Sequence, residues 1–462
     1  MRTLSSPRAG LLAVPLLLLA TRAEAQRATL ERQIASRKLP NGLTIIVAEN
    51  HAIPLATVEV VVRGGASTQA ADEQGVPHLF EHMLFRSYRS GGAHSFGEAA
   101  ARYNAAYNGT TSDEMVTYYA TVPSPSTGDA VGLMANLVIN PRFREDELKT
   151  ERSVVMGEFG RRVSDLRGQL HREMERLLWG ESFPRKNTIG EVMSLFAANP
   201  DRLTSIYHRY YVPNNAAIVV AGDVSTAAVF TEVEKRFADW KPGPDPGAAY
   251  PVPPMTPLDS TRVIVMSGDA NDITLMMMWQ GPRVTTDSID GYSADVVSEI
   301  VNDPDSDFQH RLVDSGLFTS VSMGYQSLEH VGPITLVATT SKEKLDGALT
   351  ALAVELPRMG SEGYFTDTDL AYAAKRRAVD TALGLETSDG MAETLAYWWA
   401  VTGLDHYYGY VDNLGARTTK DLRDYANRYI VGKPYIVGAL TPAADGEVIE
   451  QWLRQFVDFN RP

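Results

Sequence analysis

The stretch "GVPHLFEHMLF" (residues 75–85) places His78 and His82 four residues apart, with Glu81 between them. On a helix with about 100° per residue, these three side chains fall within an arc of about 100° and converge on one point. Imidazole nitrogens from successive turns can bind one zinc ion, and a carboxylate at this spacing can reach a water molecule at an open coordination position. The pattern therefore predicts a hydrolytic zinc site with His78 and His82 as ligands and Glu81 as general base.

The alternative is that both histidines are ordinary half-buried side chains and that Glu81 is a solvated neighbour. With nine histidines in 462 residues, a chance match to this pattern is expected on the order of 0.01 times per chain. The zinc site is therefore the favoured interpretation.

The helix that carries this motif must be held rigidly. Pro77 suits a first-turn position, where its missing N–H leaves no hydrogen bond unmade. The same segment supplies apolar side chains that can bury it against a core: Leu79, Phe80, Met83, Leu84 and Phe85.

The order H-x-x-E-H resembles the inverzincin motif of the pitrilysin and insulinase-like zinc metallopeptidases, which include the mitochondrial processing peptidases. The stretch "GGASTQAADEQGVPHLFEHMLFRS" is similar to the family's glycine turn and metal helix. "YNGTTSDEMVTYYATVP" resembles its substrate-binding edge strand, and "YYVPNNAAIVVAGDV" its closing helix-to-strand passage. The resemblance is strong in the first half and weak in the second. It implies one Zn²⁺ per chain and hydrolysis of peptide bonds by a zinc-bound water.

In the family, the third ligand is a glutamate about 75 residues after the second histidine. In "ERSVVMGE" (residues 151–158), Glu158 lies 76 residues beyond His82. Seven residues on a helix bring Glu151 and Glu158 to one face. The resemblance implies that Glu158 is the third ligand and that Glu151 has a catalytic role in supporting the ligands.

For the substrate, the resemblance implies an edge strand at residues 115–122 that binds peptides through main-chain hydrogen bonds. Asn108 matches an asparagine that the family has just upstream. Tyr118 and Tyr119 either contact the substrate or only pack on opposite faces of the sheet. Pairing through the main chain predicts loose sequence selectivity.

In the second half, the resemblance implies that an arginine and a tyrosine near a Gly-Leu pair hold the substrate. "FQHRLVDSGLFTSVS" (residues 308–322) offers Arg311, one position off the usual spacing, and has Thr319 at the tyrosine position. The incomplete pair predicts a heterodimer in which a homologous non-catalytic subunit provides both groups. The alternative is a homodimer in which Tyr325 or another residue substitutes.

The chain contains an internal repeat that defines its organisation. Residues 209–224 match residues 428–443 at an offset of 219, and residues 44–49 match residues 262–267 at an offset of 218. The second-half counterpart of the metal helix falls near residues 294–303, which contain no histidine. We therefore expect catalysis only in the first copy.

Together, the repeat and the resemblance predict an α+β fold with two homologous tandem domains, each a mostly antiparallel sheet packed with helices. A linker rich in proline and glycine follows Lys241. The expected boundaries are a signal peptide at 1–25, an N-terminal catalytic zinc-binding domain at 26–242, a linker at 243–257 and a non-catalytic C-terminal domain at 258–462.

The first 25 residues have basic residues, an apolar run and a small-x-small end, which is typical of a secretory signal peptide. The run is too short for a membrane anchor. We expect a periplasmic or secreted protein without a membrane anchor. The chain has no cysteine, so its stability must come from its core, and its net charge of −14 disfavours binding to nucleic acid.

Three functions agree with these features. The first is a zinc endopeptidase of unstructured peptides, and the second is a non-catalytic scaffold or binding subunit of such a peptidase. The third is a zinc hydrolase with a non-peptide substrate. The intact histidine motif favours the first.

Overall fold

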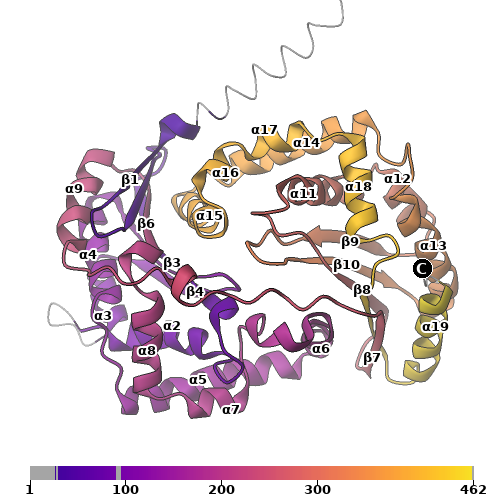
Figure 1. Ribbon diagram of the computed structural model, residues 1–462, viewed down its shortest axis with the longest axis horizontal. Helices are drawn as coiled ribbons and strands as arrows, with labels where there is room; N and C mark the ends of the chain where they lie inside the picture. Colours follow the sequence, from indigo (N-terminus) through magenta and orange to yellow (C-terminus); the bar gives the residue numbers. More distant parts are fainter. Residues whose placement is uncertain (1–26, 28–29, 90–94, 460–462) are drawn as a thin grey trace, which may run out of the picture.

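The computed structural model describes residue 27, residues 30–89 and residues 95–459 of the chain (Figure 1). The expected signal peptide at 1–25 lies outside the described residues. Each half of the chain contributes one sheet with helices packed on it (Figure 1). The fold is α+β with two tandem domains, as predicted.

The first sheet has the strand order β1-β2-β6-β3-β5-β4, and its neighbours are antiparallel except for the β2–β6 pair. Its strands are β1 (Ile34–Lys38), β2 (Thr44–Glu49), β3 (Leu55–Arg63), β4 (Ala106–Thr111), β5 (Met115–Pro123) and β6 (Ala216–Gly222).

The second sheet has the order β7-β11-β8-β10-β9, in which only the β7–β11 pair is parallel. Its strands are β7 (Arg262–Gly268), β8 (Ile273–Gln280), β9 (Ser320–Tyr325), β10 (Pro333–Thr340) and β11 (Ile436–Pro442). The order repeats that of the first sheet from β2 onwards. Thr44 pairs with Ala217, and Arg262 pairs with Ile436, which are the same positions shifted by the offsets found in the sequence.

The helices of the first half are α2 (Val76–Ser87), α3 (Phe96–Ala101), α4 (Thr127–Val138), α5 (Glu145–Ser164), α6 (Leu166–Trp179), α7 (Val192–Ala197), α8 (Pro200–Tyr210), α9 (Thr226–Phe237) and α10 (Pro246–Ala249). Those of the second half are α11 (Ser288–Asn302), α12 (Asp307–Gln309), α13 (Leu345–Arg358), α14 (Asp367–Leu383), α15 (Ser388–Val401), α16 (Leu404–Tyr408), α17 (Tyr410–Gly415), α18 (Thr419–Tyr429) and α19 (Gly446–Phe459).

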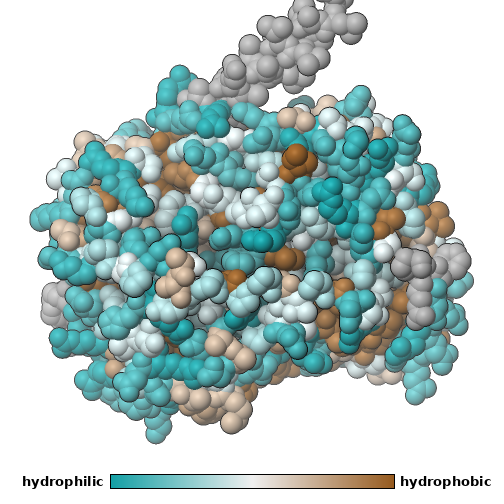
Figure 2. Space-filling view, in the orientation of Figure 1, coloured by the Kyte–Doolittle hydropathy of each residue, from teal (hydrophilic) through white to brown (hydrophobic). Residues whose placement is uncertain are grey.

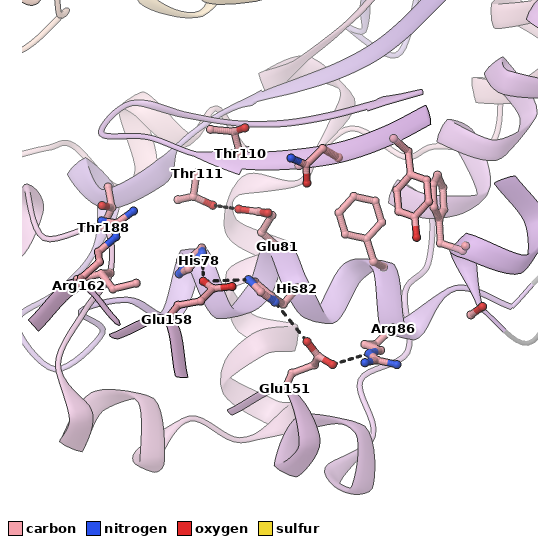
Figure 3. Close-up of a pocket in the computed structure, with 18 residues that line it drawn as sticks. His78, Glu81, His82, Arg86, Thr110, Thr111, Glu151, Glu158, Arg162 and Thr188 are labelled. Carbon is pink, nitrogen blue, oxygen red and sulfur yellow. Dashed lines mark hydrogen bonds and ion pairs between the residues drawn. The ribbon is translucent and has the colours of Figure 1, made fainter. Parts of the chain in front are cut away.

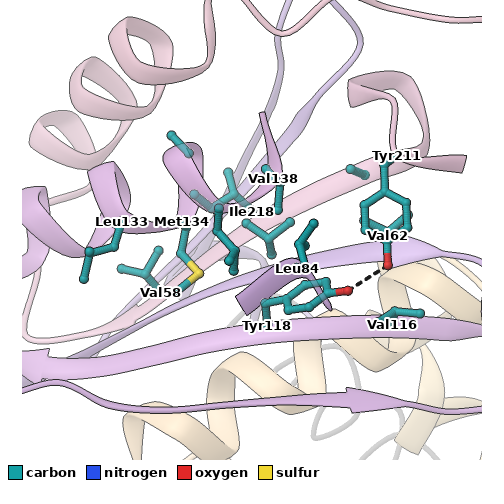
Figure 4. Close-up of a cluster of buried hydrophobic side chains, with 14 of the residues drawn as sticks. Val58, Val62, Leu84, Val116, Tyr118, Leu133, Met134, Val138, Tyr211 and Ile218 are labelled. Atoms are coloured by element: carbon teal, nitrogen blue, oxygen red, sulfur yellow. Dashed lines mark hydrogen bonds between the residues drawn. The ribbon is translucent and has the colours of Figure 1, made fainter. Parts of the chain in front are cut away.

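One face of the first sheet packs against its own helices α2, α4 and α9 to form the main core of this half. Figure 4 shows part of this core, where Val58 and Ile218 from the sheet meet Met134 and Val138 of α4. Full burial of each such side chain contributes about 1.5–3 kcal/mol. This core fixes α2, and therefore the histidine motif, against the sheet.

The other face of each sheet is covered by a helix from the opposite half. Helix α15 packs on the first sheet, where Leu395 and Trp399 contact Val219 and its neighbours. Helix α6, which follows α5 in the first half, packs on the second sheet through Leu170 and Met174. This exchange ties the two halves into one body. The connecting segment beyond Lys241 contains only the short helix α10 and no strand before β7.

Among the described residues, no helix is both long and apolar enough to cross a membrane. The face shown in Figure 2 is mainly hydrophilic, with apolar side chains scattered over it. Scattered apolar side chains of this kind are normal on protein surfaces.

The position of the edge strand differs from the sequence prediction. β5 (Met115–Pro123) pairs with β3 on one side and with β4 on the other, so it is an interior strand. Within the described residues, β4 pairs with β5 alone and forms the edge. The prediction that residues 115–122 form the edge was wrong. The stretch that resembles the family's edge strand spans both β4 and β5, and the alternation of residues 115–122 identifies a strand but not its place in a sheet.

Candidate active site

Helix α2 begins where two glycines pack against each other. Gly75 precedes the helix with φ of 81°, and a Cβ on it would lie 2.6 Å from the Cα of Gly190. Its N–H donates to Gln69 Oε1 at 2.8 Å, and Pro77 occupies the first turn. The left-handed backbone and the close approach both require glycine. The first turn of α2 is thereby fixed in place.

His78 and His82 project from successive turns of α2 towards Glu158 of α5 (Figure 3). Glu158 Oε2 lies 3.5 Å from His78 Nε2 and 3.8 Å from His82 Nε2. One ligand atom from each residue can be chosen so that all three lie within 4.8 Å of one another. Zinc binds imidazole nitrogens and carboxylate oxygens at about 2.0–2.2 Å, so these three atoms can surround one ion.

Glu151 lies on the same helix as Glu158, between His82 and Arg86 (Figure 3). Its side chain is buried, Oε2 lies 3.2 Å from His82 Nδ1, and Oε1 accepts a hydrogen bond from Arg86. A carboxylate on the far nitrogen of a ligating histidine fixes the tautomer and orientation of the ring. The contact leaves His82 Nε2 facing Glu158.

Burial lowers the pKa of His78 to about 4, and the neighbouring charges of His82 and Arg162 act in the same direction. For His82, burial alone would lower the pKa, but the hydrogen bond to Glu151 and the charges of Glu81 and Glu158 raise it. His78 is therefore neutral at physiological pH. A neutral imidazole has the free lone pair that a metal ion requires.

Glu81 lies on the same face of α2 and points towards β4 (Figure 3). Thr111 Oγ1 donates to Glu81 Oε2 at 2.7 Å. Burial raises the pKa of Glu81, and the hydrogen bond from Thr111 partly opposes this rise. A raised pKa brings a carboxylate closer to the range in which it can exchange protons near neutral pH.

Beside this cluster lies a cavity of about 570 Å³, lined by α2, β4 and α5. Asn108 lines it from the edge strand, close to Gly109. A Cβ on Gly109 would lie 2.9 Å from Glu81 Oε1, so a side chain at this position would displace the carboxylate or the strand.

The remaining predicted substrate residues lie elsewhere. Tyr118 is fully buried, and its hydroxyl hydrogen-bonds with that of Tyr211 at 2.8 Å (Figure 4). Tyr119 points to the opposite face of the sheet and lines a separate cavity with residues of α15. The two tyrosines thus lie on opposite faces of the sheet, and neither lines the cavity beside the histidines.

Arg311 is not among the residues that line the cavity beside the histidines. Its guanidinium binds both carboxylate oxygens of buried Glu355, each at 2.9 Å. A fully engaged arginine has little capacity left for a substrate.

Sequence reasoning missed Thr111, Gly109 and Arg162, which all line the cavity. Only the glycine in an otherwise polar strand, "AYNGTT", gave a signal, because glycine inside a strand often marks a close approach.

Two family models match the chain. Residues 44–178 match the model described as "Insulinase (Peptidase family M16)", and residues 197–377 match the "Peptidase M16 inactive domain". The chain belongs to the M16 peptidase family. The "inactive domain" model lies mainly over the half without the histidine motif.

Among M16-like relatives, the chain is 24% identical over 352 residues to YmxG of Bacillus subtilis, named an "uncharacterized zinc protease". The match covers 76% of this chain and 84% of YmxG. It is 21% identical over 425 residues to a probable mitochondrial-processing peptidase subunit beta of Arabidopsis thaliana, with 88% and 78% covered. The first of these relatives is thus named as a zinc protease and the second as a subunit of a processing peptidase.

Two solved structures share the fold. A protease from Helicobacter pylori has a TM-score of 0.77 and 21% identity, with 88% of this chain and 99% of that chain covered. The periplasmic protease PqqL of Escherichia coli has a TM-score of 0.75 and 15% identity, with 93% of this chain and 50% of PqqL covered.

Proposed function

We propose that this chain is a zinc metallopeptidase that hydrolyses peptide bonds of unstructured peptides. The observation that supports this most strongly is the convergence of His78, His82 and Glu158, whose ligand atoms lie within 4.8 Å of one another, with Glu81 lining the same cavity. The zinc proteases among the relatives support the same metal and reaction class.

His78, His82 and Glu158 would hold one Zn²⁺ per chain, and Glu151 would orient His82. The donor set fits the ion, because two nitrogens and one carboxylate leave a coordination position open. His78 Nδ1 is buried and has no hydrogen-bond partner in the described residues, so its ring is held by packing and not by a competing acceptor.

A bound zinc ion would activate a water molecule and polarise the scissile carbonyl. Glu81 would accept a proton from that water and later deliver it to the leaving amine. Thr111 would hold the carboxylate in position, since its hydroxyl donates to Oε2 and leaves Oε1 available.

The edge strand β4 would bind the substrate through its main chain, next to Glu81 and Asn108. Only an extended, unpaired segment can add to a sheet edge, so folded proteins would be poor substrates. Because such pairing reads the backbone, cleavage would tolerate many sequences.

We propose that the chain works in the periplasm or outside the cell as the catalytic subunit of a heterodimer. The signal-like segment at residues 1–25 supports the location, and PqqL is a periplasmic protease of the same fold. The ion pair of Arg311 with Glu355 supports a partner that supplies the substrate-binding arginine. A homodimer is the alternative.

The test is metal analysis of the purified chain together with cleavage of an unstructured peptide, with and without added zinc. One zinc per chain and metal-dependent cleavage are expected. Bound zinc without peptide cleavage, even in the presence of a co-expressed homologue lacking the histidine motif, would point to a non-peptide substrate. Neither zinc nor cleavage would point to a scaffold subunit. Weak activity that rises with a co-expressed homologue lacking the histidine motif would support the heterodimer. Full activity of the chain alone, unchanged by such a homologue, would refute it.

A further inference from the structure

The turn between β4 and β5 connects the edge strand of the first half to the second half. Glu114 in this turn is only 6% exposed. Its carboxylate accepts hydrogen bonds from Glu329 N at 2.7 Å and His330 N at 2.8 Å, and His330 Nδ1 lies 2.9 Å away. All three partners belong to the β9–β10 loop of the second half. A carboxylate with three donors is a strong and well-directed contact.

The preceding residue makes a second connection to the same loop. Lys186 Nζ donates to Asp113 Oδ2 at 3.0 Å and to Val331 O at 2.9 Å. The ammonium also lies 4.7 Å from the centre of the Trp179 ring, and Lys186 is only 5% exposed. The lysine therefore joins the turn to the loop inside the protein.

The β9–β10 loop, residues 326–332, is itself fixed to the body of the second half. Val284 N donates to Leu328 O at 2.9 Å, and Gly332 N donates to Pro282 O at 3.3 Å. The loop therefore provides a fixed support for the turn.

At its other end, the hairpin touches the proposed general base. Thr111 is the last residue of β4, three residues before Glu114, and donates to Glu81 Oε2 at 2.7 Å. A small displacement of the turn would therefore move this hydroxyl relative to α2.

The backbone of the turn is also held by its own half. Gly64 N donates to Glu114 O at 2.9 Å, and Ala66 N donates to Ser112 O at 3.0 Å. These backbone bonds would keep the hairpin folded if the Glu114 carboxylate contacts were lost. The expected result of that loss is therefore a small shift of the hairpin and not its unfolding.

We propose that Glu114 is a positioning residue through which the second half holds β4 and Thr111 against Glu81. This inference rests on the proposed peptidase function. On this proposal, the second half, which has no metal ligands, contributes to the reaction by positioning the edge strand through the loop at residues 329–331.

The first test replaces, one at a time, the two side chains of the contact, Glu114 and His330. Glu114→Gln presents an amide N–H₂ to one of the donors, and kcat is expected to fall about tenfold. Zinc content should stay at the parent value, and Tm should fall by only a few degrees, because one buried donor loses its acceptor. His330→Ala should also lower kcat. His330→Asn keeps a donor nitrogen close to the place of Nδ1 and should retain kcat within about twofold of the parent.

Ser388→Ala is the matched control. Thr57 Oγ1 donates to Ser388 Oγ at 3.0 Å, so this variant removes a hydrogen bond between the two halves without touching the β4–β5 turn. Its kcat is expected to equal that of the parent. An equal loss of kcat in Ser388→Ala would show that general contact between the halves matters, which would overturn the specific role of Glu114.

A double-mutant cycle tests the route through Thr111. In a Thr111→Val background, Glu114→Gln should change kcat by less than about twofold, because the hydroxyl that transmits the effect is gone. Losses that multiply independently would overturn the proposal. So would a Glu114→Gln protein with lowered Tm and undiminished kcat. A parent that is inactive both alone and with a co-expressed homologue lacking the histidine motif would overturn the proposed function and this inference together. An active parent with normal kcat in Glu114→Gln would overturn only this inference.

Discussion

Helix α11 has the place in the second half that α2, with its two histidines, has in the first. Asp295 and Glu299 lie four residues apart on α11, as the histidines do on α2. Arg377 reaches both from α14, and its Nη2 lies 2.9 Å from Glu299 Oε1 and 3.8 Å from Asp295 Oδ1. Tyr410 completes the cluster by donating to Asp295 Oδ2 at 2.6 Å.

The register of the sheets fixes this correspondence. Val60 pairs with Ile218 in the first sheet. Met277 lies 217 positions after Val60, Val437 lies 219 positions after Ile218, and these two residues pair in the second sheet. The shift of 217 makes Asp295 and Glu299 the equivalents of His78 and His82, and the shift of 219 makes Arg377 the equivalent of Glu158.

The two clusters differ in their balance of hydrogen-bond donors and acceptors. In the first half, the lone pairs of two imidazoles and one carboxylate converge, and only a cation can satisfy them together. In the second half, two carboxylates converge on a guanidinium, so the chain supplies its own cation. The same helix pair thus holds a candidate metal site in one copy and a closed ion-pair cluster in the other.

The largest expected effect is on the rate of peptide cleavage, which should depend on Glu81 but not on Ser298, the equivalent residue of the second half. Glu81→Gln should lower the rate of peptide cleavage at least about a hundredfold while zinc stays bound, because the proton acceptor is lost but the ligands remain. Ser298 Oγ donates to Ala294 O on its own helix, so Ser298→Ala should leave the rate unchanged. Steady-state kinetics with metal analysis checks both. Near-normal turnover in Glu81→Gln would show that Glu81 is not the general base.

The next effect concerns metal affinity. Glu158→Gln should weaken zinc binding more than Glu151→Gln does, because an amide carries no negative charge to the ion. Loss of a supporting carboxylate such as Glu151 typically lowers metal affinity about 10–100-fold. Competition with a chelator measures both variants. The opposite order would mean that the ligand and its support have been exchanged.

In the second half, Arg377→Met should lower stability without affecting zinc. It leaves buried Asp295 and half-buried Glu299 without their cation, which costs about 3 kcal/mol of the free energy of unfolding. Urea denaturation gives the stability, and metal analysis should still find the parent zinc content. Loss of zinc with unchanged stability would contradict the separation of the two clusters.

The smallest effect is a pH dependence. Burial raises the pKa of Asp295 to about 6, although Arg377 and the hydrogen bond from Tyr410 oppose the rise. Folding therefore favours the protonated carboxyl, and this stabilisation is present at low pH and disappears as the pH rises through 6. Between pH 5 and 7.5 the parent should lose about 1 kcal/mol relative to Asp295→Asn. Parallel stability curves for the two proteins would contradict the raised pKa.

Much of the candidate site follows from the sequence, because helix periodicity converts spacing into geometry. The spacing of His78, Glu81 and His82 places the three on one face of a helix wherever that helix packs. The repeat offsets likewise predicted two copies of one fold, because equivalent strands carry equivalent apolar patterns. Resemblance to a family added Glu158 and Glu151, which lie too far along the chain for periodicity to connect them to the histidines.

Only the tertiary structure decided which strand is the edge, because alternation in residues 115–123 is the same for an interior strand. It also decided the contact of Thr111 with Glu81, the joining of Glu114 to the second half and the covering of each sheet by a helix of the other half. These contacts join residues 30 or more positions apart, and their partners are selected by packing and by satisfaction of buried polar groups, which no local pattern in the sequence encodes.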